Sequence, residues 1–140
     1  MIIIDTNVIS ELWKVEPEPA VLAWMDEQAV ETLYLSAVTV AELRYGIAAM
    51  AEGKRRALFM ARLENDVLPV FNGRVLPFDL ETSRAYAELM ARAKVVGKAI
   101  AMADGFIAAT AITHGFIVAT RDTSPFLAAG AKVFNPWIST

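Results

Sequence analysis

The chain has 140 residues and a net charge of −3, with 56% hydrophobic and 21% charged residues. This length predicts a single domain spanning residues 1–140, and the composition excludes a disordered chain. Because there is no cysteine and only one histidine, disulfides, thiolate metal sites and histidine-rich zinc sites are excluded. Any bound metal must therefore have oxygen ligands. The negative charge argues against binding nucleic acid through a basic surface.

No stretch of the sequence is apolar for the ~18 residues that a membrane helix requires. A signal peptide is not expected either, because no basic region precedes the short apolar run Ile2–Ile4. Together with the absence of cysteine, these features favour the cytoplasm. The high apolar content has two interpretations that stay open: an alanine-rich core, or a surface that meets another subunit.

Taken in chain order, short β-branched runs alternate with longer helical patterns, which is typical of an α/β domain. Ile2–Ile4 is apolar throughout, as in a strand buried on both faces, and a helix through Leu12 follows it. The later predicted strands are Leu33–Leu35, Arg74–Phe78, Ile117–Ala119 and Val133–Phe134, and Pro77 indicates a strand end or an edge. The later predicted helices are Ala20–Gln28, Thr39–Met50, Lys54–Val67, Glu81–Val96 and Ile100–His114. A parallel sheet with helices on both faces accommodates this order.

Two acidic residues come just after predicted strands. Asp5 directly follows the strand at 2–4, and Asp122 follows the strand at 117–119. The carboxyl ends of parallel strands form the edge at which open α/β sheets bind ligands. Each acid also has a structural interpretation, since Asp5 could cap the next helix and Asp122 could be a turn residue.

Two further acids lie on faces of predicted helices that are otherwise apolar. Asp104 is expected to point toward the sheet, where an unpaired charge is costly. Glu42 is also expected to point inward, although Thr39-x-x-Glu42 matches a capping box as well. The face of Asp104 contains Ile100, Ile107, Ala108 and Ala111, and that of Glu42 contains Val38, Tyr45, Gly46 and Ala49.

These four acids could meet at one edge of the sheet. Two carboxylates ~4 Å apart repel by about 4 kcal/mol at an effective dielectric constant of about 20. Several such pairs would rival the whole stability of a domain, about 5–15 kcal/mol. Either some acids are protonated or a cation lies among them, and oxygen ligands favour Mg²⁺ or Mn²⁺. Such a site can activate water for phosphodiester cleavage.

Six segments in order along the chain carry a further signal: Ile3–Leu12, Leu35–Arg44, Val75–Asp79, Ala103–Ala111, Ala119–Asp122 and Phe134–Trp137. They resemble the PIN-domain family, specifically VapC toxins of its FitB-like branch, along nearly the whole chain. The resemblance implies a three-layer α/β/α fold with a central parallel sheet. It also implies a metal-dependent endoribonuclease that is the toxin of a type II toxin–antitoxin system.

By analogy with the family, an acidic pocket would bind Mg²⁺ or Mn²⁺ through Asp5, Glu42, Asp104 and Asp122. Asn7 and Thr120 match the polar residues that accompany the first and fourth acids, and they are expected to have supporting roles. The fourth acid is the least uniform position in the family. Many relatives have an acid just before an aromatic residue, where this chain has Pro125.

Relatives of this kind are commonly homodimers and are neutralised by a small antitoxin. The N-terminal part of the antitoxin binds operator DNA, and its C-terminal segment covers the toxin groove, often with an Arg in the acidic pocket. A guanidinium group suits that place because it pairs with carboxylates and competes with metal. DNA binding would then be a function of the antitoxin, and the negative charge of this chain would not argue against its resemblance to VapC toxins.

Among the basic residues, Arg121 and Lys98 are the best candidates for holding the RNA backbone, because each is near a predicted acid. The other lysines and arginines are expected on solvated helix faces, and the three tryptophans in the core or an interface. An alternative function is an inactive PIN-like module that acts by binding protein or nucleic acid. A phosphatase of the haloacid-dehalogenase type is excluded because Asn7 stands where a second Asp is required, and a receiver domain because its acid pair is absent.

Overall fold

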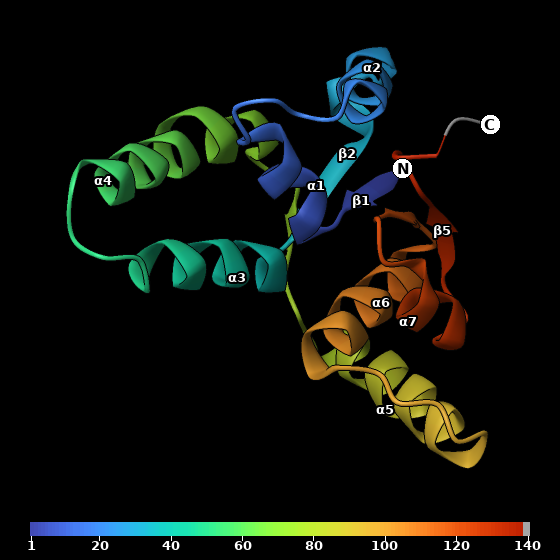
Figure 1. Ribbon diagram of the computed structural model, residues 1–140. Coiled ribbons are helices and arrows are strands. Elements are labelled where there is room, and N and C mark those ends of the chain that lie inside the picture. Colours follow the sequence, from blue (N-terminus) through green and yellow to red (C-terminus); the bar gives the residue numbers. More distant parts are fainter. Residues whose placement is uncertain (139–140) are drawn as a thin grey trace.

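A computed structural model describes residues 1–138. Its strands form one parallel sheet in the order β3-β2-β1-β4-β5 (Figure 1). The strands are β1 Ile2–Ile4, β2 Leu33–Ser36, β3 Val75–Leu76, β4 Ile117–Ala119 and β5 Lys132–Phe134. In the centre, Ile3 of β1 lies opposite Tyr34 of β2 and Val118 of β4. The strand order reverses between β1 and β4, and open parallel sheets have their ligand crevice at such a point.

Helices cover both faces of this sheet. They are α1 Thr6–Leu12, α2 Pro19–Glu27, α3 Ala37–Ala48, α4 Lys54–Ala61, α5 Leu80–Val95, α6 Met102–His114 and α7 Thr123–Ala128. A π-helical turn, Arg62–Val67, continues α4, and short 3-10 segments lie at Val30–Thr32 and Leu68–Phe71. Figure 1 shows α3 and α4 extending away from the sheet on one side and α5 and α6 lying together on the other. No helix of residues 1–138 has both the length and the apolar character needed to cross a bilayer.

Alternating strand residues separate the core into two halves. Ile3 and Val118 pack with the core residues of α5, α6 and α7, whereas Ile4 and Ala119 pack with those of α1, α2 and α3. All four residues are completely buried. This alternation follows from the two-residue repeat of a strand. The expected three-layer α/β/α fold is therefore confirmed.

Several observed elements differ from the predicted ones. The strand expected at Arg74–Phe78 contains only Val75 and Leu76, because Pro77 has no N–H to continue the ladder, and it lies at the sheet edge as expected. The helix expected from Ile100 begins at Met102, after Ala101, which has extended backbone angles. Helix α7 was not predicted at all.

Candidate active site

Asp5 links the central strand β1 to helix α1, and only 5% of its surface is exposed. Its Oδ1 accepts the N–H of Thr6 at 2.8 Å and thereby caps α1. Its Oδ2 accepts the hydroxyl proton of Thr120 at 2.7 Å. The cap interpretation is therefore correct for one oxygen of this carboxylate, while the second oxygen is held by Thr120, the residue that follows β4.

Thr120 is fully buried and connects three parts of the site. Its hydroxyl oxygen accepts Asn7 Nδ2 and the Asp122 backbone N–H, both at 3.2 Å. Because these donors occupy the oxygen lone pairs, the single hydroxyl proton is left for Asp5. Asn7 Nδ2 also lies 3.5 Å from Asp5 Oδ2. Asn7 and Thr120 thus both contact Asp5, and together they fix its orientation.

Glu42 lies on α3, which begins earlier than predicted. The N-cap is Ser36, whose hydroxyl accepts the N–H of Thr39 at 3.0 Å. The capping box expected for Thr39 and Glu42 is therefore wrong. The expected inward orientation is wrong too, because Glu42 is exposed and the buried face of α3 contains Thr39, Val40, Leu43 and Ile47. Glu42 Oε1 instead accepts the hydroxyl proton of Thr6 at 2.7 Å, next to Asp5.

Asp104 is half-buried in the first turn of α6. The helix dipole favours a negative charge at this end of a helix. Ile107 and Ala108 of the same helix are completely buried, in agreement with the predicted apolar face. Asp122 is exposed at the N-terminal end of α7, and its side chain forms no capping hydrogen bond.

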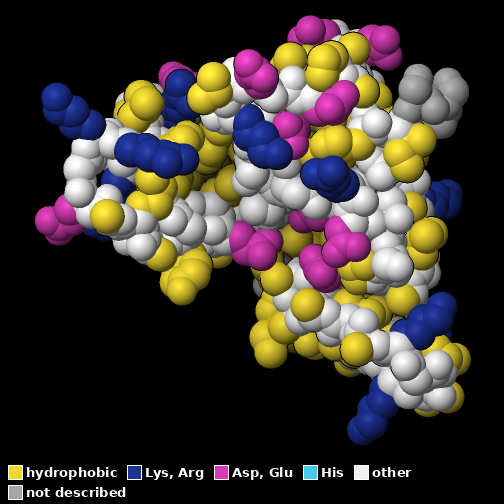
Figure 2. All heavy atoms as spheres, in the orientation of Figure 1, with side chains coloured by type: hydrophobic (Ala, Val, Ile, Leu, Met, Phe, Trp, Pro, Cys, Tyr) yellow, Lys and Arg dark blue, Asp and Glu magenta, His cyan; other side chains and the backbone are white. Residues whose placement is uncertain are grey.

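Two clefts meet at Asp104. The first, called the acidic cleft here, has a volume of about 400 Å³ and contains Asp5, Glu42 and Asp104 together with Arg121. The second, the lateral cleft, has a volume of about 650 Å³ and contains Asp104 and Asp122 with Lys98. Figure 2 shows acidic side chains gathered in the middle of this face, with basic side chains beside them. Three predicted acids thus share one cleft, and the fourth shares its neighbour.

The acids influence one another's protonation. Burial raises the pKa of Asp5 from its usual 3.8 to about 6. Hydrogen bonds from Thr120 and Thr6 oppose this rise, and the charges of Asp104 and Glu42 add to it. The pKa of Asp104 is raised by burial first and then by the charges of Asp122 and Glu42. A negative charge on Asp5 or Asp104 is therefore less favourable here than in water.

The donor set fits a hard divalent cation in its chemistry. Every acid offers oxygen ligands, and a positive charge would favour the ionised forms of Asp5 and Asp104, whose pKa values are raised by burial first and by neighbouring acids second. Within residues 1–138, however, no three carboxylate or histidine groups are close enough to hold one metal ion. Glu42 is held by Thr6, and Asp122 lies in the lateral cleft.

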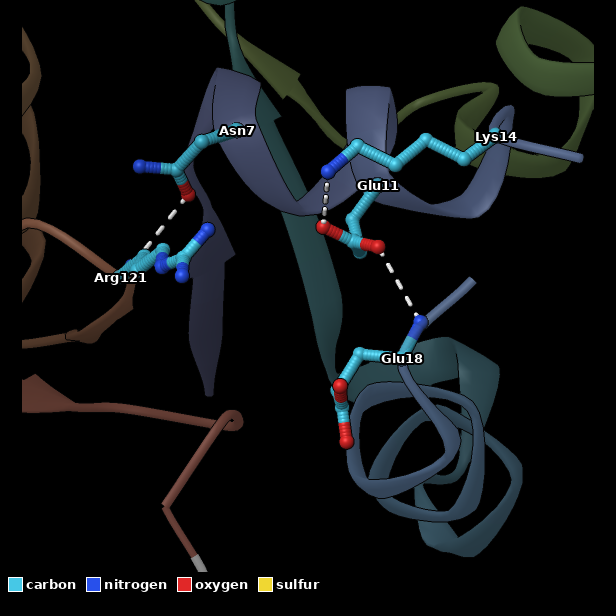
Figure 3. Close-up of polar contacts among 5 residues, drawn as sticks. All are labelled: Asn7, Glu11, Lys14, Glu18 and Arg121. Carbon is cyan, nitrogen blue, oxygen red and sulfur yellow. Dashed lines mark hydrogen bonds and ion pairs between the residues drawn. The ribbon is translucent and has the colours of Figure 1, made fainter. Parts of the chain in front are cut away.

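The residues of the acidic cleft that sequence reasoning missed include Thr6 and Glu11. Glu11 is 5% exposed, and its carboxylate accepts Lys14 Nζ at 2.9 Å and the Glu18 N–H at 3.1 Å (Figure 3). The hydrogen bond from Lys14 is the main cause that lowers the pKa of Glu11. The position of Glu11 one helical turn after Val8 could have indicated burial. Nothing in the sequence indicates the contact of Thr6 with Glu42.

Residues 2–132 match the PIN domain family, and the chain belongs to that family. It is 69% identical over 137 residues to VapC ribonuclease Y4jK of Sinorhizobium fredii (strain NBRC 101917 / NGR234), covering 98% of each chain. It is 53% identical to toxin FitB of Neisseria gonorrhoeae (strain ATCC 700825 / FA 1090), covering 98% of this chain and 99% of FitB. A solved structure of FitAB bound to an IR36 DNA fragment contains a chain with 50% identity and a TM-score of 0.96, covering 100% of this chain and 98% of that one. The chain is therefore a PIN-domain protein of the VapC/FitB type, as its motifs predict.

Proposed function

We propose that this protein is a metal-dependent endoribonuclease that hydrolyses RNA phosphodiester bonds, with residues 1–140 as a single nuclease domain. The observation that carries the proposal is the meeting of Asp5, Glu42 and Asp104 in one cleft, with Asp122 beside Asp104. This cleft lies where the strand order reverses, at the edge of the sheet that suits ligand binding. The 69% identity to a VapC ribonuclease also supports nuclease activity.

The four acids would hold Mg²⁺ or Mn²⁺ after Glu42 and Asp122 turn toward Asp5 and Asp104, because no three acids among residues 1–138 lie close enough to hold one ion in this structure. A bound metal would supply an activated water and stabilise charge on the phosphate oxygens. The polar neighbours orient the acids: the Thr120 hydroxyl holds Asp5, and the Thr6 hydroxyl holds Glu42. Asn7 in turn fixes Thr120, so that the Asp5 carboxylate is positioned before substrate arrives.

We also infer that the protein is the toxin of a type II toxin–antitoxin pair acting in the cytoplasm. Its relative FitB is named a toxin, and FitAB has been solved bound to a DNA fragment. The partner would be a small antitoxin that binds operator DNA and blocks the acidic cleft. The toxin itself would form a homodimer, within a larger complex when the antitoxin is bound to DNA.

Mapped cleavage of total cellular RNA by antitoxin-free protein tests the proposal. With Mg²⁺ or Mn²⁺ we expect discrete cuts that a chelator abolishes. Asp104→Asn should reduce cleavage by more than about 100-fold because it removes one metal ligand. Asp26→Asn, an exposed position in α2 outside both clefts, is the control and should cleave normally. If folded, partner-free protein makes no cuts, the alternative of an inactive binding module is favoured instead.

A further inference from the structure

Among residues 1–138, the acidic and lateral clefts each contain one basic side chain that forms no ion pair with a carboxylate, and the two clefts share Asp104. We propose that Arg121 and Lys98 bind backbone phosphates of the RNA on opposite sides of the scissile bond. The RNA strand then crosses Asp104 from the acidic cleft into the lateral cleft. This inference rests on the proposed nuclease function and adds the path of its substrate.

Arg121 is held in place along its backbone and its side chain. Its N–H donates to Asn7 Oδ1 at 3.3 Å, and its carbonyl accepts Asn135 Nδ2 at 3.5 Å. Figure 3 shows Asn7 and Arg121 facing each other across the first of these hydrogen bonds. The guanidinium carbon lies 5.4 Å from the centre of the Trp137 ring, at cation–π distance. A planar group held in this way has little freedom left to lose on binding a phosphate.

Arg121 remains available although acids surround it. Within residues 1–138, the ion pairs shorter than 4 Å are Lys14 with Glu11 and Arg44 with Glu64. Lys14 lines the same cleft as Arg121, but its charge is already paired. The guanidinium of Arg121 therefore keeps its donors for an anionic group that enters the cleft.

Lys98 has the corresponding position in the lateral cleft. It follows Gly97, whose φ of +73° ends α5, and its backbone N–H donates to the Ala93 carbonyl at 2.8 Å. The helix end thus fixes the base of the side chain, while the side chain itself is exposed. Ser124 in the same cleft adds a hydroxyl group that can donate to a phosphate.

The arrangement of charges in the two clefts supports one path for the RNA strand. Acids lie where the clefts meet, and a basic group lies in the cleft on each side. The phosphate that is cleaved belongs beside the acids, where a metal would offset their charge. The RNA phosphates on either side of the cleaved one would be repelled by the acids unless basic side chains bound them. Arg121 and Lys98 meet that requirement.

RNA binding measured in an Asp104→Asn background, in which cleavage is expected to be more than about 100-fold slower, tests the path. The probe is a short, fluorescein-labelled, mixed-sequence single-stranded RNA with Mg²⁺, and anisotropy is recorded over a series of NaCl concentrations. Losing one phosphate contact should lower the slope of log K against log salt by about 0.7. We expect this reduction, with an increase of Kd, for Arg121→Gln and for Lys98→Gln. Arg121→Lys should keep the slope because it keeps the charge.

The matched control is Arg84→Gln, which removes one exposed charge from α5 outside both clefts. It should leave the slope and Kd unchanged. Unchanged slopes for Arg121→Gln and Lys98→Gln would overturn the proposed RNA path. An Asp104→Asn protein that binds no RNA would overturn it too, because this variant should keep the phosphate contacts of both Arg121 and Lys98. If the slopes are reduced but the unsubstituted protein shows no metal-dependent cleavage, the proposed nuclease function is wrong and the proposed phosphate contacts of Arg121 and Lys98 are retained.

Discussion

Asp5 differs in its protonation between the folded and the unfolded chain. Its pKa is about 6 in the folded protein and 3.8 when unperturbed. Because the folded state binds the proton more tightly, the stability linked to this group is fully present below pH 3.8 and is lost as pH rises through 6. At neutral pH the ionised Asp5 therefore destabilises the metal-free fold by about 3 kcal/mol.

Asp5→Asn should accordingly raise the free energy of unfolding at pH 7 in chelator by about 2 kcal/mol. The gain is smaller than the full 3 kcal/mol because an amide cannot accept from both Thr6 and Thr120, and a lost hydrogen bond costs about 1 kcal/mol. Urea denaturation at pH 7 and near pH 4 measures the effect, which should disappear at the lower pH. Asp26→Asn provides the exposed control, and a gain independent of pH would contradict the explanation.

Some site residues lie where the sequence predicts them and others do not. The difference is whether a local pattern is enough to predict the position of the side chain. Asp5 and Asp104 follow from local patterns, a strand end and a helix face. The orientation of Glu42 depends on where α3 begins, and both Ser36 and Thr39 suit an N-cap. The contact of Glu42 with Thr6 joins residues distant in sequence. A local pattern cannot specify such a contact.

At the scale of elements, the close packing of α5 and α6 positions Asp104. Gly105, its neighbour, is buried against Tyr86 and Met90 of α5, and a Cβ there would lie 3.0 Å from an atom of each. The Tyr86 ring is itself packed against Phe106, with ring centres 4.7 Å apart. The absence of a side chain at Gly105 therefore allows α6 to approach α5.

Gly105→Ala should destabilise the fold by about 1–2 kcal/mol, because overpacking outweighs the gain in helix propensity. Gly46→Ala is the matched comparison, since Gly46 lies within α3 and a Cβ there would meet nothing within 4 Å. It should stabilise by up to about 1 kcal/mol. Thermal and chemical denaturation of both variants checks the pair. Equal changes in stability at the two positions would show that helix propensity alone determines the effect of replacing Gly by Ala.

The elements that could not be predicted are those that depend on tertiary packing. Helix α7 has six residues, includes Pro125, and buries Phe126 completely in the core. So short a helix is stable only through its contacts, and its sequence has no complete helical period to detect. The central strands and the long helix α5 were predictable because apolar runs and helical spacing extend over their whole length.

At the scale of the whole molecule, the site joins β1, α3, α6 and the segment after β4. A metal held by all of them should stabilise the folded state globally, by about 2.7 kcal/mol at a concentration 100 times its Kd. We expect Mg²⁺ to raise the melting temperature of the unsubstituted protein and not that of Asp104→Asn. Sodium chloride at matched ionic strength controls for screening. An equal rise in both proteins would place the stabilising ion elsewhere.

The position of β1 at the centre of a parallel sheet has a consequence for synthesis. β1 is made well before its partner β4, which is followed by Thr120 and Asp122. A growing chain therefore lacks the complete cleft until the segment after β4 has been made. For the proposed nuclease, this order of assembly would spare the message and the ribosome while the earlier segments are being made. An antitoxin would need to intercept only chains that already contain this segment.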